Sequence, residues 1–194
     1  MVRIGVTGHV RLQPSAHRVI ARDLKRLLRG YPGVHGVTCL AEGADRLFAE
    51  AVMACRGSFE AVLPVPEISA APEEDRSLRS LLRFASDVTK ITVPGPPEAS
   101  YAVASHEMVL RSDVLVAVWD GSDEGLRGGT AETVEFARQQ GREVRVVWPE
   151  LPPDCQEELM STRSTRSSWL GRCIPRWPGQ ASAPAAIAGS NRAG

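Results

Sequence analysis

The stretch that decides the fold is residues 112–141, SDVLVAVWDGSDEGLRGGTAETVEFARQQG. It opens with the apolar run Val114–Trp119, which is rich in β-branched residues and too short for a helix. We therefore predict a strand that is buried on both faces. Residues 120–129 then contain four glycines, and from Ala131 onward the apolar residues recur at helical spacing as far as Gly141. The stretch predicts a strand, a glycine-rich loop and the N-terminus of a helix.

This arrangement turns the free backbone N–H groups of a helix N-terminus toward the space above one edge of the sheet. We predict that Gly128, Gly129 and Thr130 hold a phosphate there. The alternative is that the glycines only turn the chain and that Thr130 only caps the helix, because short glycine motifs often match by accident. Two further loops with glycine at the same sheet edge favour the phosphate.

Outside this stretch, strands and helices alternate along the chain. Further strands are predicted at Val2–Val6, Gly36–Leu40, Phe59–Val65, Asp87–Val93 and Glu143–Trp148, with helices from about Pro14, Ala44, Glu73 and Glu98. Alternation of this kind gives right-handed βαβ crossovers. The predicted fold is α/β, a three-layer Rossmann-like, doubly wound and mostly parallel sheet of about six strands.

Ligands on such sheets bind beyond the carboxyl ends of the strands, where the strand order reverses. The loops after the first, second and fifth strands all lie at that edge, and each carries glycine. The candidate nucleotide-binding residues from these loops are Thr7, Gly8, His9, Arg11, Gly43, Ala44, Asp45, Asp120, Gly128, Gly129, Thr130 and Glu132. We expect them to meet above a single crevice and to present unpaired amides to an anion.

Each charged candidate has an alternative role. Arg11 either forks onto a phosphate or is an ordinary surface arginine, and His9 either contacts the ligand or bonds to the backbone of its turn. Asp45 either holds ribose hydroxyls or favours the N-terminus of its helix. Asp120 either binds a ribose hydroxyl or a metal-bound water or forms an Asp-Gly turn. Glu132 either acts as a base on a ribosyl carbon or caps its own helix.

Composition excludes several classes of protein. Hydrophobic residues make up 43% of the chain, charged residues 24%, and the formal net charge is zero. We therefore do not expect nucleic acid or an anionic membrane as the partner. The four cysteines have neither CxxC nor Cys/His spacing, so we expect no metal site and a reduced, cytoplasmic setting. No apolar run approaches the length of a membrane-spanning helix.

The last part of the chain differs from the rest. From about residue 159 it contains five arginines and no acidic residue, and it ends in GQASAPAAIAGSNRAG. We predict one ligand-binding domain over residues 2–150 and a disordered tail over 159–194, because an Ala/Gly/Ser/Pro sequence buries too little surface to offset its ordering entropy.

Three motifs together carry a family resemblance. GVTGHVRL after the first strand, CLAEGADRLFAEA after the second, and VLVAVWDG with GGTAETVEFA around the fifth resemble the SLOG superfamily. These are Rossmann-like nucleotide-binding domains related to the Lonely guy phosphoribohydrolases and to DNA-processing protein A. The resemblance covers about residues 2–148 and is greatest to the stand-alone bacterial proteins of the group. It implies a nucleotide ligand such as ADP-ribose, NAD or a nucleoside monophosphate, and it implies that a homodimer is possible.

The chain departs from the hydrolases of this group at one important place. They carry P-G-G-x-G-T-x-x-E with a catalytic glutamate, whereas this loop reads L-R-G-G-T-A-E-T, with Thr133 at the glutamate position. Glu132 is one residue early, about 100° around the helix. We therefore expect a nucleotide sensor or binding domain without a certain cofactor. The alternative is an N-glycosidase that releases the base from a nucleoside 5′-monophosphate, with Glu132 and Asp120 as its carboxylates, so whether the chain is an enzyme stays open.

Overall fold

The computed structural model describes residues 1–65, 75–122 and 128–149. Residues 1–148 form one unit, and the account below concerns that unit by itself. The predicted tail over 159–194 lies outside the described residues, as do the segments 66–74 and 123–127. None of the helices in the described part of the chain combines the length and the hydrophobicity needed to span a bilayer.

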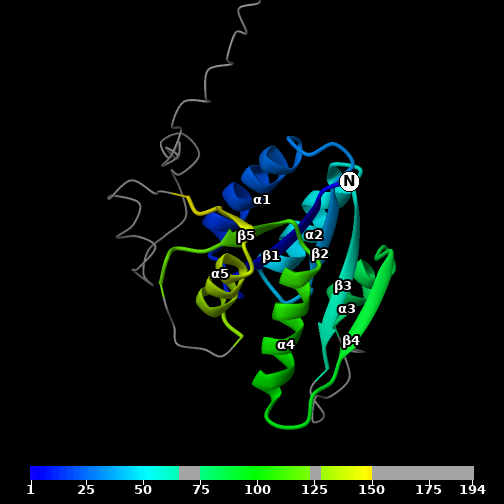
Figure 1. The fold of residues 1–194 in the computed structure, drawn as a ribbon. Helices are drawn as coiled ribbons and strands as arrows, with labels where there is room; N and C mark the ends of the chain where they lie inside the picture. Colours follow the sequence, from blue (N-terminus) through cyan, green and yellow to red (C-terminus); the bar gives the residue numbers. More distant parts are fainter. Residues whose placement is uncertain (66–74, 123–127, 150–194) are drawn as a thin grey trace, which may run out of the picture. The chain divides into compact units, whose positions relative to one another are not determined.

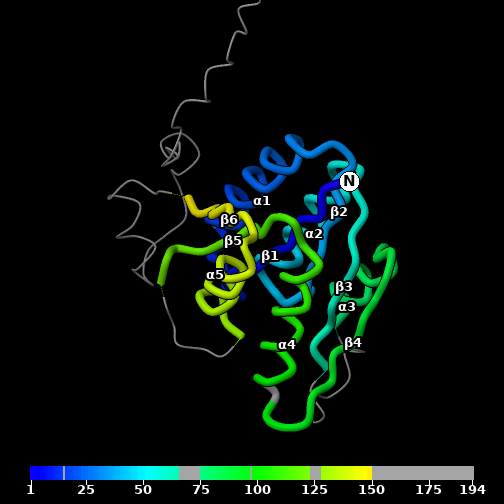
Figure 2. Tube along the Cα trace, in the orientation of Figure 1, coloured from blue at the N-terminus to red at the C-terminus, as the bar shows by residue number. Residues whose placement is uncertain are grey.

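A parallel sheet of six strands forms the centre of this unit (Figures 1 and 2). The strands are β1 (Arg3–Gly8), β2 (His35–Thr38), β3 (Ser58–Pro64), β4 (Asp87–Ile91), β5 (Val114–Val118) and β6 (Glu143–Val146). Their order in the sheet is β4-β3-β2-β1-β5-β6, and every neighbouring pair is parallel. The predicted α/β fold with a doubly wound sheet is confirmed.

In the part of the chain that the structure describes, five helices cover the two faces of the sheet. They are α1 (Pro14–Leu28), α2 (Ala44–Ala54), α3 (Arg76–Leu82), α4 (Pro97–Leu110) and α5 (Thr130–Gln139). The first three belong to one apolar cluster, and α4 and α5 belong to a second cluster on the opposite face (Figure 1). This division follows from right-handed crossovers, because the chain moves outward from β1 to β4 and then returns across the sheet to β5 and β6.

The central strands divide their side chains between these two clusters. On β5, Val114, Val116 and Val118 pack with the α1–α3 face, while Leu115 and Ala117 pack with the α4–α5 face. All five residues are buried, as the apolar run predicts. The strand is therefore fixed from both sides, and its carboxyl end is held firmly beside that of β1.

Three element boundaries differ from the predictions in ways that bear on the site. The strand β1 continues through Thr7 and Gly8, which we expected in the following loop, because both residues pair with β5. Helix α3 is shorter than the predicted Glu73–Ala85, and its N-cap is Asp75, whose carboxylate accepts hydrogen bonds from the amides of Ser77 and Leu78. Strand β6 ends at Val146, two residues before the predicted end.

Candidate ligand cleft

The strand order reverses between β1 and β5, and a cleft of about 570 Å³ opens at the carboxyl ends of the strands there. Five separate segments of the described chain line it: Val6–Arg11, the start of α2 with the loop before it, Pro64 at the end of β3, the middle of α4, and Gly128–Thr130. A cleft at this switch point is where parallel α/β sheets bind their ligands. Its volume lies within the roughly 300–1,000 Å³ typical of small-molecule sites.

The first wall of the cleft is the end of β1 and the loop that follows it. Gly8 allows the strand to pass close to its neighbours, because a Cβ atom there would come within 2.6 Å of the Cβ of Ala44 and of the carbonyl oxygen of Val118. The amide of His9 donates to the carbonyl of Val118 over 3.1 Å. The loop is thereby attached to β5, and Arg11 beyond it is an exposed cation at the cleft.

The second wall is the loop between β2 and α2, which is organised around a buried carboxylate. Oδ2 of Asp45 accepts hydrogen bonds from Oγ1 of Thr38 at 3.1 Å and from the amide of Cys39 at 3.0 Å. Burial raises the pKa of Asp45 to about 6, although these hydrogen bonds oppose the shift. Asp45 therefore has a structural task as well as a place on the cleft wall, and it titrates close to neutral pH.

Gly43 joins the first and second walls. Its φ is +77°, and a Cβ atom would collide with the carbonyl oxygens of His9 and Val10, so only glycine fits. The amide of Ala44 donates to the carbonyl of His9 over 3.2 Å. The loop after β1 and the start of α2 are therefore one rigid support. Gly43 and Ala44 act behind the cleft and are not among the described residues that line it.

The third wall is the N-terminus of α5. Gly129 is the N-cap and Thr130 the first helical residue, and both line the cleft with Gly128. The backbone of Gly128 has a φ of +74° and packs against α4, because a Cβ atom there would come within 2.8 Å of the amide nitrogen of Ala102. The alternative in which Thr130 is itself the cap does not apply.

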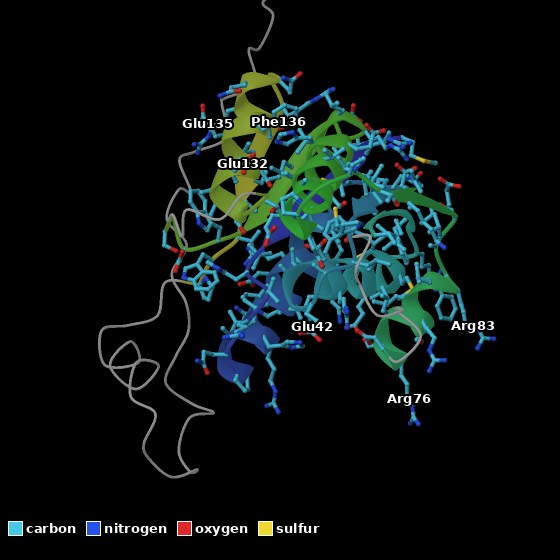
Figure 3. All side chains as sticks on the ribbon, turned by 90° about the horizontal axis from the view of Figure 1, so that it is seen from below. Glu42, Arg76, Arg83, Glu132, Glu135 and Phe136 are labelled. Carbon is cyan, nitrogen blue, oxygen red and sulfur yellow. The ribbon has the colours of Figure 1, made fainter. Side chains whose placement is uncertain are left out.

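Glu132, which is labelled on α5 in Figure 3, contacts the third wall through Gly128. Its Oε2 accepts a hydrogen bond from the amide of Gly128 at 2.6 Å, and its Oε1 lies 3.7 Å from Nε2 of His106 on α4. The ring of His106 stacks on Phe136 at 3.9 Å between centroids. The carboxylate of Glu132 is therefore engaged by the residue just before the N-cap, and no side chain caps the helix at Gly129 itself.

The fourth wall comes from α4 and was not predicted. Tyr101, Ser105 and Met108 line the cleft with Cys39, Ala41 and Pro64. Burial and the charge of Asp45 raise the pKa of the Cys39 thiol well above its ordinary value, and the hydrogen bond with Ser105 opposes them only in part. The only available signal was the spacing of Tyr101, Ser105 and Met108 at i, i+4 and i+7, which places them on one helix face.

The expectation of unpaired amides needs correction. The amides of His9, Ala44 and Gly128 are all engaged in hydrogen bonds within the protein. Eight of the predicted residues line the cleft: Thr7, Gly8, His9, Arg11, Asp45, Gly128, Gly129 and Thr130. An anion in the cleft would therefore contact side chains and the first turn of α5, and not a row of free loop amides.

Asp120 is not among the described residues that line the cleft, but it contacts His9, which does line it. The carboxylate is exposed, its Oδ1 accepts from the amide and the hydroxyl of Ser122, and it lies 3.1 Å from Nε2 of His9. Gly121, which follows, has a φ of +91°. The Asp-Gly turn that we considered is therefore present. No group of three His, Cys, Asp or Glu residues suited to a metal occurs among the described residues.

Comparison with known proteins places the fold. No family model and no curated protein matches the chain. Among solved structures, TM1055 is 22% identical with a TM-score of 0.51, over 74% of this chain and 72% of that one. The DNA processing protein A of Helicobacter pylori is 15% identical with a TM-score of 0.55, over 75% and 64%. The molybdenum cofactor carrier protein of Chlamydomonas reinhardtii is 18% identical with a TM-score of 0.50, over 82% and 83%.

These similarities concern the fold, since every identity is low. This chain spans less than two thirds of the DNA processing protein A chain. All three structures have the same strand-and-helix architecture that the motifs GVTGHVRL, EGAD and GGTAE predict for this sequence. The chain has a Rossmann-like α/β fold.

Proposed function

We propose that this domain binds a nucleotide or a nucleotide-derived ligand, such as ADP-ribose, NAD or a nucleoside monophosphate, in the cleft between β1, β2, α4 and α5. The observation that carries the proposal is that two segments far apart in the sequence line the same cleft at the switch point of the sheet: the loop after β1, with His9 and Arg11, and the start of α5, with Thr130. A guanidinium and a helix N-terminus together favour a phosphate.

Binding is favoured over hydrolysis by the positions of the two carboxylates. The N-glycosidase alternative requires Glu132 and Asp120 to act on a ribosyl carbon, but Glu132 holds the amide of Gly128 and Asp120 holds Ser122 and His9. Neither is among the described residues that line the cleft. The molybdenum cofactor carrier protein is by its name a carrier of a small cofactor, which also supports a binding role for this fold.

Binding of single-stranded nucleic acid should be measured in the same experiments as binding of nucleotides. The zero net charge led us not to expect it, but that expectation finds no support in the comparisons. The DNA processing protein A of Helicobacter pylori has a single-stranded DNA binding mode. A single-stranded oligonucleotide at physiological salt should therefore be measured beside the nucleotides, because phosphate contacts weaken strongly as salt rises.

Titration calorimetry with AMP, ADP-ribose and NAD tests the proposal, together with mass spectrometry of any ligand that purifies with the protein. Arg11→Gln should weaken binding about tenfold or more, since a charge-assisted hydrogen bond contributes about 1.5–3 kcal/mol. Arg18→Gln is the matched control, because Arg18 is an exposed arginine on α1 outside the cleft. Absence of binding by all three nucleotides, or equal losses in the two variants, would contradict the proposal.

A further inference from the structure

His9 has a surrounding that the proposed ligand contact alone does not explain. Its side chain is only 16% exposed, although it lines the cleft. Nε2 lies 3.1 Å from Oδ1 of Asp120, and the ring meets the edge of Trp148 at 5.1 Å between centroids. Two residues from beyond β5 and β6 therefore fix the orientation of an imidazole that belongs to the loop after β1.

Asp120 is itself held in place as an anion. Its Oδ1 accepts from the amide of Ser122 at 2.9 Å and from the hydroxyl of Ser122 at 2.6 Å. Partial burial acts to raise the pKa of Asp120, but the bonds from Ser122 and His9 outweigh it and the pKa is lowered. A permanently ionised carboxylate beside one ring nitrogen stabilises the doubly protonated imidazolium.

The second ring nitrogen of His9 is available for a ligand. Within the described residues, Nδ1 of His9 has no hydrogen-bond partner, whereas Nε2 lies 3.1 Å from Oδ1 of Asp120 and 3.4 Å from the amide nitrogen of the same residue. The amide can donate only to an unprotonated Nε2, so a proton on Nε2 keeps the shorter contact, with the carboxylate, and gives up the longer one. When a carboxylate holds Nε2–H, the protonated ring presents Nδ1–H as a donor. A phosphate oxygen in the cleft is the kind of acceptor that such a charged donor binds best.

We propose that His9 binds a ligand phosphate as an imidazolium that Asp120 positions, so that the domain takes up a proton when the ligand binds. The inference rests on the proposed function and specifies how that site recognises its ligand. His9 touches the phosphate, whereas Asp120 acts through His9 and is a positioning residue. Net proton uptake on ligand binding is the measurable consequence, because the imidazolium carries one proton more than the neutral ring.

Other ionisable groups lie near His9, and the experiment must distinguish their contribution to proton uptake from that of His9. Arg11, on the same loop, stays protonated at all relevant pH values. From α2, Asp45 shares the cleft, and its pKa of about 6 lets it ionise in a nearby range. Tyr101 of α4 lines the same cleft, and Glu132 of α5 is bonded to the amide of Gly128. The number of protons taken up does not by itself distinguish His9 from Asp45, so the variants must identify the group that takes up the proton.

Calorimetry with ADP-ribose in buffers of different ionisation enthalpy counts the protons taken up on binding. ADP-ribose is the probe because its phosphates stay ionised from about pH 5.5 to about pH 8, whereas the phosphate of AMP titrates near pH ~6. We expect net proton uptake by the unmodified protein when it binds ADP-ribose. His9→Gln should abolish this uptake. His17→Gln, an exposed histidine on α1, should leave it unchanged.

Asp120→Asn provides a second, independent variant, since this side chain is exposed and its replacement leaves the core intact. It should reduce the proton uptake at a given pH. Binding of ADP-ribose without proton uptake, or uptake that persists in His9→Gln, would overturn this inference and leave the proposed function standing. No binding of ADP-ribose by the unmodified protein at any pH would overturn both.

Discussion

Asp45 is an unusual residue because it is buried, 5% exposed, and carries a carboxyl whose pKa is raised to about 6 by burial. Its ionised form is therefore disfavoured in the folded protein compared with the unfolded chain, where the ordinary value is 3.8. The associated stability is fully present below the unfolded pKa and is lost as pH rises through the folded pKa.

We predict that Asp45→Asn removes the loss of stability that accompanies ionisation of Asp45. The unfolding free energy of the unmodified protein should fall by on the order of 3 kcal/mol between about pH 4 and about pH 6, because each tenfold change in a protonation equilibrium corresponds to roughly 1.36 kcal/mol. The amide oxygen of asparagine can still accept the bonds from Thr38 and Cys39, so the variant should show a flatter profile. Urea unfolding across this range measures it.

Glu50→Gln is the control for this prediction, because Glu50 lies on the same helix and is exposed. Its profile should follow that of the unmodified protein. An Asp45→Asn profile that keeps the full slope would show that another group is responsible for the loss between those pH values.

Gly43 offers a second test on a single residue, since it joins the two loops that bear His9 and Asp45. Gly43→Ala should lower the unfolding free energy by about 2 kcal/mol or more, from the positive φ together with the collision with the carbonyls of His9 and Val10. Gly33→Ala has a similar φ of +68° but open space around it, so it should cost only about 1–2 kcal/mol. Thermal and urea unfolding of both variants would show the difference, and equal losses would mean that the packing against His9 contributes nothing.

Some properties of these residues were readable in the sequence and others were not. Glycine after a strand and a carboxylate at a helix start indicated the right loops, because local chemistry determines turns. The hydrogen bonds that engage the amides of His9 and Gly128 were not readable, since their partners, Val118 and Glu132, depend on how the loops meet in space. The same holds for the bond from Asp120 to His9, which joins residues 111 positions apart.

Helix α5 begins at the cleft, and its first turn carries Glu132 bonded to the amide of Gly128. We predict that Glu132→Ala lowers the unfolding free energy by about 1 kcal/mol, because the amide of Gly128 loses its acceptor. It should also loosen Gly128–Thr130 and weaken nucleotide binding modestly, without abolishing it. Unfolding and calorimetry on the same variant measure the two effects.

Glu135→Ala is the matched control on the same helix (Figure 3). Its carboxylate accepts only from the side chain of Gln139 at 3.2 Å, so a change of less than about 0.5 kcal/mol is expected. Full loss of binding in Glu132→Ala, with a stable fold, would instead indicate direct contact between this carboxylate and the ligand.

Most helices and strands could be predicted because their hydrophobic periods are strong, and β5 is the best example. The contribution of α4 to the cleft was missed for a physical reason. Its residues Tyr101, Ser105 and Met108 reach the cleft only because the chain crosses back over the sheet between β4 and β5. The periodicity of α4 shows a helix, but it does not show which strand ends lie beneath each turn.

Away from the cleft, a charge network joins elements from the whole domain. Glu60 on β3 is buried, and its Oε1 lies 2.6 Å from Nη2 of Arg3 on β1 and 3.7 Å from Nη1 of Arg111 after α4. Its Oε2 lies 3.5 Å from Nε2 of His35 on β2. Removal of one partner from such a network leaves a partly buried charge unpaired, which destabilises the folded protein.

We predict that Glu60→Ala lowers the unfolding free energy by about 2–3 kcal/mol, somewhat less than for a fully buried pair because the side chain of Arg3 is 39% exposed. Glu143→Ala removes an exposed carboxylate that pairs only with Arg145, and it should change the free energy by less than about 1 kcal/mol. Guanidinium unfolding would mask ionic effects, so urea is the appropriate denaturant. Similar losses in both variants would contradict the special role of Glu60.

The central position of β1 has a consequence for how long the cleft persists. This strand is hydrogen-bonded to β2 on one side and β5 on the other, and its last residues, Thr7 and Gly8, form part of the cleft. Its backbone amides should therefore exchange with deuterated solvent only through openings that approach global unfolding, whereas the edge strands β4 and β6 exchange sooner. The part of the cleft formed by Thr7 and Gly8 should thus persist through most fluctuations of the domain.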